Sequence, residues 1–144
     1  MVQIDVNFEI PKTVIKKLNI VFNLDTITTD EYELVVLADV SGLIKDNLNK
    51  FDSTLTSKES TNYSRPSVQM TISESVTGYN IGYTSINVAV AGGVCKVGGF
   101  LIIKKSSKDI LAACLTLNSV NLNETFNIFP ETSLYVFGEK VCTA

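Results

Sequence analysis

The chain has 144 residues, of which 45% are hydrophobic and only 19% are charged, and its formal net charge is −3. This length fits one domain, spanning residues 1–144, with a hydrophobic core of its own. Charged residues make up about a quarter of an average soluble protein, so this chain is expected to cover part of its surface with protein partners. Arg65 is the single arginine, and lysines form no basic face, which argues against nucleic acid as a partner.

Histidine is absent from the sequence. Its absence removes the Ser-His and Cys-His nucleophile pairs and the commonest zinc ligand. The three cysteines, Cys95, Cys114 and Cys142, are far apart and form no CxxC pair, so neither a metal cluster nor a redox motif is indicated. We therefore expect a protein that is not an enzyme, binds no cofactor or metal, and keeps its thiols free.

The first ten residues alternate between apolar and polar side chains. They lack the basic and continuously apolar regions of a signal peptide. Nor does the sequence contain a run of 18 apolar residues that could span a membrane. We therefore expect a protein made in the cytoplasm, not secreted by a signal peptide, and without a membrane partner.

Strands are predicted from the beginning of the chain. Alternation over residues 2–10 is typical of a half-buried strand, which Pro11 ends. A second alternating segment follows at residues 18–24 and predicts another strand.

Residues 28–51 fit two interpretations. Thr28 and Glu31 could form a capping box at the start of a helix. The β-branched segment that follows could equally be a strand that ends at Ser41-Gly42. We favour a strand through residue 40 and then one short helix near residues 43–51.

The rest of the chain also indicates β structure. Residues 52–67 are polar and rich in Ser and Thr, which predicts an exposed polar loop. Further strands are expected at residues 68–72, 79–91, 94–103, 110–117 and 133–138. The predicted fold is therefore all-β: a two-layer antiparallel β-sandwich of about seven to nine strands, with at most one short helix near 43–51.

The stretch AVAGGVCKVGGFLII, residues 89–103, carries two Gly-Gly pairs. It lacks the lysine and hydroxyl residue that a phosphate-binding P-loop requires. Gly-Gly favours type I′ hairpin turns, so we expect a tight three-stranded meander in which Val90 opposes Cys95 and Val97 opposes Phe100. One of the two glycine pairs could instead form a β-bulge.

Such a meander would be apolar on both faces. One face would carry Val88, Val90, Cys95, Val97, Phe100 and Ile102. The other face would carry Ala89, Ala91, Val94, Leu101 and Ile103. Because a single small domain has one core, the second face is a candidate protein interface, or the back of a second layer of a sandwich.

Other candidate sites are weaker. The carboxylates of the first third of the chain match no calcium-binding loop and are expected to lie in solvent. Ser41 and Lys45 could act as a catalytic Ser-Lys dyad. However, Ser and Lys are so common in this chain that their proximity is expected by chance. Tyr63, Tyr79 and Tyr83 form a candidate binding surface for a glycan or a protein.

Taken together, these features favour a non-enzymatic structural or assembly protein that packs against itself or a larger lattice. We expect a virion component of a phage or other virus: a capsid accessory, minor capsid or tail protein made in the host cytoplasm and present as a homo-oligomer. The alternative is a receptor- or glycan-binding head module of a fibre or adhesin, with residues 51–67 and the tyrosines as its contact surface.

Overall fold

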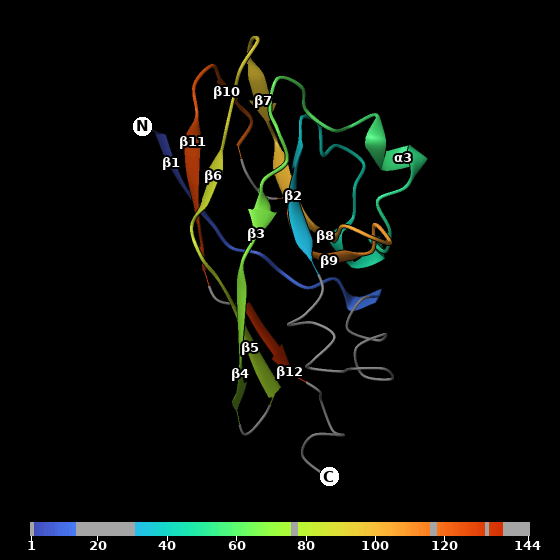
Figure 1. Ribbon diagram of the computed structural model, residues 1–144. Coiled ribbons are helices and arrows are strands. Elements are labelled where there is room, and N and C mark those ends of the chain that lie inside the picture. Colours follow the sequence, from blue (N-terminus) through green and yellow to red (C-terminus); the bar gives the residue numbers. More distant parts are fainter. Residues whose placement is uncertain (1, 14–30, 76–77, 116–117, 132, 137–144) are drawn as a thin grey trace.

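The computed structural model describes residues 2–13, 31–75, 78–115, 118–131 and 133–136, with only the backbone described for 70–81 and 133–136. These residues form an all-β structure (Figure 1), as predicted. The strands are β1 (Val2–Val6), β2 (Tyr32–Leu37), β3 (Ser67–Val68), β4 (Met70–Ser75), β5 (Gly78–Tyr83), β6 (Ile86–Val88), β7 (Cys95–Val97), β8 (Gly99–Lys104), β9 (Ile110–Cys114), β10 (Val120–Leu122), β11 (Phe126–Pro130) and β12 (Ser133–Val136). The helical elements are a 3-10 turn, η1 (Lys45–Asn47), and one short helix, α3 (Ser53–Thr56).

Two sheets pack face to face around the larger core. The central sheet has the strand order β3-β2-β8-β9, and the side sheet has the order β1-β11-β6. Alternate residues of β2 and β8, such as Leu34 and Ile102, point toward the side sheet, which contributes Phe126 and Ile128. All four side chains are fully buried. The antiparallel sandwich is thus confirmed, although β1 pairs with β11 in parallel.

The opposite face of the central sheet is covered by the chain itself. Val35, Leu101 and Ile103 point away from the side sheet and are fully buried. They pack in a second core cluster beneath the segment 40–55, which contributes Leu48, among others, to that cluster. We call this segment the cover segment. The central sheet is therefore apolar on both faces because it is the middle of three layers.

The predicted helical segment is only partly helical. A 3-10 turn, η1, lies inside residues 43–51, whereas α3 falls just after them. The preference for a strand before it is confirmed by β2, which ends at Leu37 and not at residue 40. The alternative of a helix that starts at Thr28 is wrong for the described residues that follow it, because residues 32–37 form the strand β2. The predicted strand at 18–24 lies outside the described residues.

The meander predicted for residues 88–103 is wrong in its pairing. β6 pairs with β11, β7 with β10, and β8 with β2 and β9, so none of these three strands is hydrogen-bonded to another. Gly92 and Gly93 do have positive φ angles of 87° and 150°, as a turn requires. Gly98, by contrast, has no positive φ.

Gly98 is needed for close packing rather than for a turn. A Cβ added at this residue would lie 2.8 Å from the backbone oxygen of Ala38, and the Gly98 amide donates a hydrogen bond to the Leu37 oxygen (2.7 Å). β7 and β8 therefore run nearly continuously through Gly98, while the partner changes from β10 to the central sheet. A glycine pair in a strand can thus mark a backbone crossing as well as a hairpin.

A third sheet, with strand order β12-β5-β4, lies below the two sheets of the sandwich in Figure 1. β4 follows β3, which belongs to the central sheet, and β5 precedes β6, which belongs to the side sheet. The hairpin that β4 and β5 form therefore separates at its base into the two layers. Its two arms join the sheets of the sandwich to each other.

Candidate functional site

The five residues of the predicted interface do not form one surface. Ala89, Ala91 and Val94 are exposed, and Val94 is 49% accessible. Leu101 and Ile103 are fully buried beneath the cover segment. The interface prediction is therefore wrong for Leu101 and Ile103, because the cover segment, and not a partner, packs on this face of the sheet.

The side sheet presents a different surface, its outer face. Along β1, Gln3 and Asp5 are exposed, while the residues between them pack on the core. The strand register places Gln3 beside Asn127, and Asn127 beside Asn87, so that three amide side chains form a row across the sheet. The Asn87 amide nitrogen donates to the Asn127 amide oxygen over 2.8 Å.

The second row of this outer face consists of Asp5 beside Phe129. Phe129 is 37% accessible, so its ring contributes apolar area to the outer face. Asp5 is the one charged residue of the two rows. A surface of amides with one aromatic ring resembles the composition of protein interfaces, where charged residues are depleted and aromatic residues enriched.

The outer face ends at β1, whose second side carries no other described strand. β1 lies at the edge of the side sheet and, among the described residues, is paired only with β11. The central sheet has backbone contacts along parts of its outer sides instead. Glu9 exchanges two 2.9 Å backbone hydrogen bonds with Ala113 of the edge strand β9. The Ser60 amide donates to Val36 over 2.8 Å, where β2 extends beyond its two-residue pairing with β3. Unpaired edge strands are templates for pairing with another chain.

Two of the three tyrosines of the predicted binding surface are packed against the fold. Tyr63 and Tyr83 are both packed against the larger core, and the Tyr83 ring lies 5.4 Å from the Phe8 ring between centroids. The Tyr63 hydroxyl accepts a hydrogen bond from the Val36 amide (2.9 Å) and donates to Glu59. The side chain of Tyr79 lies outside the described residues. The two described tyrosines thus stabilise the fold.

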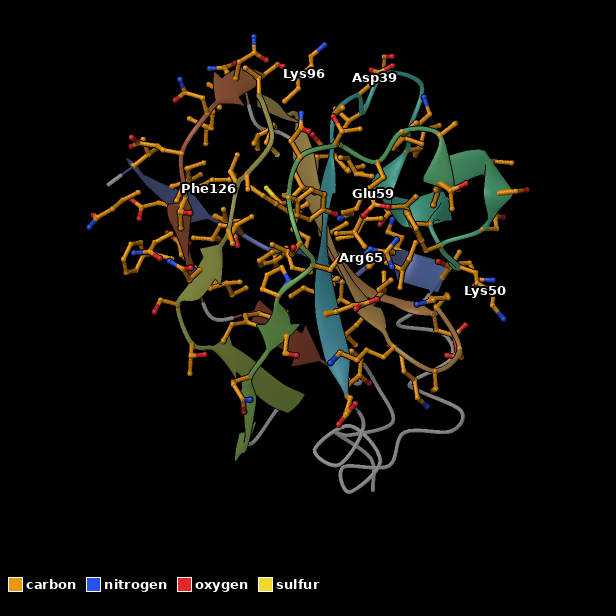
Figure 2. All side chains as sticks on the ribbon, turned by 45° about the horizontal axis from the view of Figure 1, so that its top comes forward. Asp39, Lys50, Glu59, Arg65, Lys96 and Phe126 are labelled. Atoms are coloured by element: carbon orange, nitrogen blue, oxygen red, sulfur yellow. The ribbon has the colours of Figure 1, made fainter. Side chains whose placement is uncertain are left out.

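A charged network that the sequence did not reveal lies beside β2 (Figure 2). Arg65 donates two 2.8 Å hydrogen bonds to Glu59 in a bidentate pair and a third, of 3.0 Å, to Glu33. Lys108 also approaches Glu33, at 3.3 Å. The Arg65 guanidinium lies 5.2 Å from the centre of the Phe51 ring, which belongs to the second core cluster.

The network holds residues 59–65 against the central sheet. Burial alone would raise the pKa of Glu59, but hydrogen bonds from Arg65 and Tyr63 outweigh it and keep this pKa below its usual value. The Glu59 carboxylate is thus held in its charged form by the Arg65 guanidinium and the Tyr63 hydroxyl. The predicted exposed loop, 52–67, is accordingly polar but attached, with Leu55 and Ser60 buried.

The sequence offered one weak indication of this network. Arg65 is the only arginine and follows Glu59 by six residues in a polar segment. The other two members of the network, Glu33 and Lys108, are far from Arg65 in the sequence. The arrangement therefore depends on the pairing of β2 with β8.

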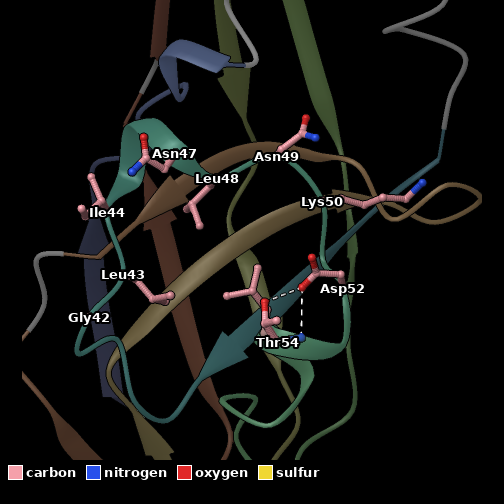
Figure 3. Close-up of a pocket in the computed structure, with 10 residues that line it drawn as sticks. Gly42, Leu43, Ile44, Asn47, Leu48, Asn49, Lys50, Asp52 and Thr54 are labelled. Carbon is pink, nitrogen blue, oxygen red and sulfur yellow. Dashed lines mark hydrogen bonds between the residues drawn. The ribbon is translucent and has the colours of Figure 1, made fainter.

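A pocket of about 270 Å³ opens in the cover segment (Figure 3). Its lining residues are Gly42, Leu43, Ile44, Asn47, Leu48, Asn49, Lys50, Asp52, Thr54 and Leu55. Asp52 is already engaged as the N-cap of α3, because it accepts hydrogen bonds from the Thr54 amide (3.0 Å) and hydroxyl (2.6 Å). Asp52 thus has a structural role as the N-cap of α3, at one end of the pocket.

Other reactive groups are likewise engaged or dispersed. Cys95 and Cys114 are free and buried, as expected of core residues, and burial raises the pKa of the Cys95 thiol. Among the described residues, no three His, Cys, Asp or Glu side chains are placed to hold a metal ion. Within the same part of the chain, no helix is long and apolar enough to cross a membrane.

Comparison with known proteins gives no relationship from which a function could be transferred. No family model, no curated protein and no solved structure matches the chain.

Proposed function

We propose that this chain is a non-enzymatic structural protein that assembles with copies of itself or with a larger lattice. The observation that carries the proposal is the outer face of the side sheet, together with the open edge of β1. The amide row of Gln3, Asn127 and Asn87 loses little solvation when it is covered, compared with a row of charged groups. Phe129 adds apolar area that is exposed to water in the isolated chain.

The same structure favours assembly over catalysis. Arg65 and Glu59 form a part-buried, neutralising ion pair, and the described cysteines are buried. Binding through sheet faces and edges needs only a rigid framework, which the three-layer arrangement provides. We place the protein in a virion, as a capsid accessory, minor capsid or tail component of a phage or other virus, because low charge and an Asn-rich β-fold suit a subunit whose surface is largely covered.

The mass of the purified protein in solution tests the assembly proposal. Sedimentation velocity between about 1 and 100 μM should show species at multiples of 15.7 kDa that increase with concentration. A single 15.7 kDa species over the whole range would contradict assembly of the chain with copies of itself. The virion assignment has a separate test, which is detection of the chain by mass spectrometry in purified particles.

A further inference from the structure

We propose that β1 pairs with β1 of a second copy of this chain, antiparallel and centred on Ile4, so that two side sheets join into one. This inference rests on the proposed function and specifies the surface and the partner. Of the open edges whose side chains the structure describes, β1 is the longest: it has five residues, against three in β10.

The symmetry of the pairing follows from the two faces of the side sheet. Val2 and Ile4 face the core and are half-buried, whereas Gln3 and Asp5 face outward. A two-fold axis normal to the sheet makes the two β1 strands antiparallel and keeps both core faces on one side. A two-fold axis along the strand would make them parallel and place the core face of one copy beside the outer face of the other.

The register follows from side-chain parity and charge. Only pairings of odd with odd and even with even positions keep the faces aligned. Centring on Asp5 would oppose two like charges, and centring on Gln3 would leave Val6 without a partner from β1. Centring on Ile4 pairs the whole strand.

In the Ile4-centred register, each outward row is chemically matched. Gln3 of one copy lies opposite Asp5 of the other, so an amide can donate to a carboxylate on each side of the axis. On the core face, Val2 lies opposite Val6, and Ile4 lies opposite Ile4 of the second copy. The half-buried Val2 and Ile4 therefore gain apolar neighbours.

A disulfide test reads the register directly. In a Cys142→Ser background, Ile4→Cys should give a covalent dimer on mild oxidation, because the two Ile4 positions face each other across the axis. Val2→Cys is the matched control. In the same register its two copies are four residues apart along the strands, about 13 Å, which is too far for a disulfide bond.

A charge test uses the exposed position 3 and leaves the core unchanged. Gln3→Asp should place a carboxylate opposite Asp5 of the other copy on both sides of the two-fold axis. The repulsion should raise the dissociation constant of the dimer by about two- to thirtyfold. Gln3→Lys should lower the dissociation constant by a similar factor, since it opposes Asp5 with a positive charge. These variants keep the inference testable even where Ile4→Cys folds poorly.

The outcomes separate this inference from the proposed function. Crosslinking at position 4 but not at 2, with opposite effects of the two Gln3 variants, supports the β1 pairing. Crosslinking at position 2 instead, or an oligomer that is insensitive to position 3 and does not crosslink at 4, overturns the pairing while leaving assembly in place. A protein that is monomeric at every concentration overturns the β1 pairing and the self-assembly part of the proposed function.

Discussion

Truncation of Leu101 tests the three-layer architecture. Leu101 lies on β8 with 0% of its side chain accessible, in the cluster between the central sheet and the cover segment. Leu101→Ala removes fully buried methyl groups and leaves a cavity between two layers that cannot both collapse. Such substitutions typically reduce the free energy of unfolding by about 2–5 kcal/mol. That is a large part of the roughly 5–15 kcal/mol total of an ordinary domain.

Urea denaturation followed by circular dichroism measures this loss. With an m-value of about 2 kcal/mol/M, the unfolding midpoint should fall by about 1–2.5 M. Val94→Ala is the matched control from the same stretch of sequence. Because Val94 is 49% accessible, its truncation should change the free energy of unfolding by less than about 0.5 kcal/mol. A Leu101→Ala protein as stable as the Val94→Ala control would refute the covering of β8 by residues 40–55.

Further predictions concern the charged network, the glycines and the thiols. Arg65→Ala should lower the free energy of unfolding by about 1–3 kcal/mol, because it leaves part-buried carboxylates without their donor; denaturation no different from wild type would contradict this. Since the pKa of Glu59 in the folded protein is below its ordinary value of 4.5, its contribution is present above pH 4.5 and is lost as the pH falls through the folded value. Stability curves from pH 7 to pH 3 should show this loss, and Glu59→Gln should remove that part of it. Gly98→Ala should lower the thermal midpoint more than Gly42→Ala, because a Cβ at Gly98 meets backbone at 2.8 Å whereas one at Gly42 meets nothing within 4 Å. The reverse order would show that the positive φ angle of Gly42 costs more when alanine adopts it than the close contact at Gly98. In a Cys142→Ser protein, a thiol reagent should modify the buried native cysteines only after unfolding.

The fold class could be predicted from the sequence because strand periodicity is local. The alternation in residues 2–10 and the apolar run of β9 were sufficient to identify strands. Pairing could not be predicted in the same way, since it depends on which distant strands meet. Gly98 illustrates the difference: its glycine suggested a hairpin, whereas the fold uses it where β8 begins to run beside Ala38.

The candidate site was less predictable than the fold. Two-sided apolarity in residues 88–103 correctly indicated cover on both faces for β8, where Leu101 and Ile103 are buried, but not for the exposed Ala89, Ala91 and Val94. However, the sequence could not show that the chain supplies the second cover itself, because the apolar residues of the cover segment, such as Leu48 and Leu55, are spaced among polar ones. The outer face of the side sheet was missed for a related reason: Gln3, Asn87 and Asn127 become a row only through the register of β1, β11 and β6.

Hydrogen exchange of β1 at different protein concentrations tests the central claim most directly. The claim is that the chain covers its own central sheet and leaves the edge of β1 for a partner. The backbone amides of β8 should be protected at every concentration, since both neighbours of this strand belong to the same chain. Protection of Val2–Val6 should increase as the concentration rises from about 1 to 100 μM. Protection of β1 that does not depend on concentration, in a protein that sediments as an oligomer, would contradict the account.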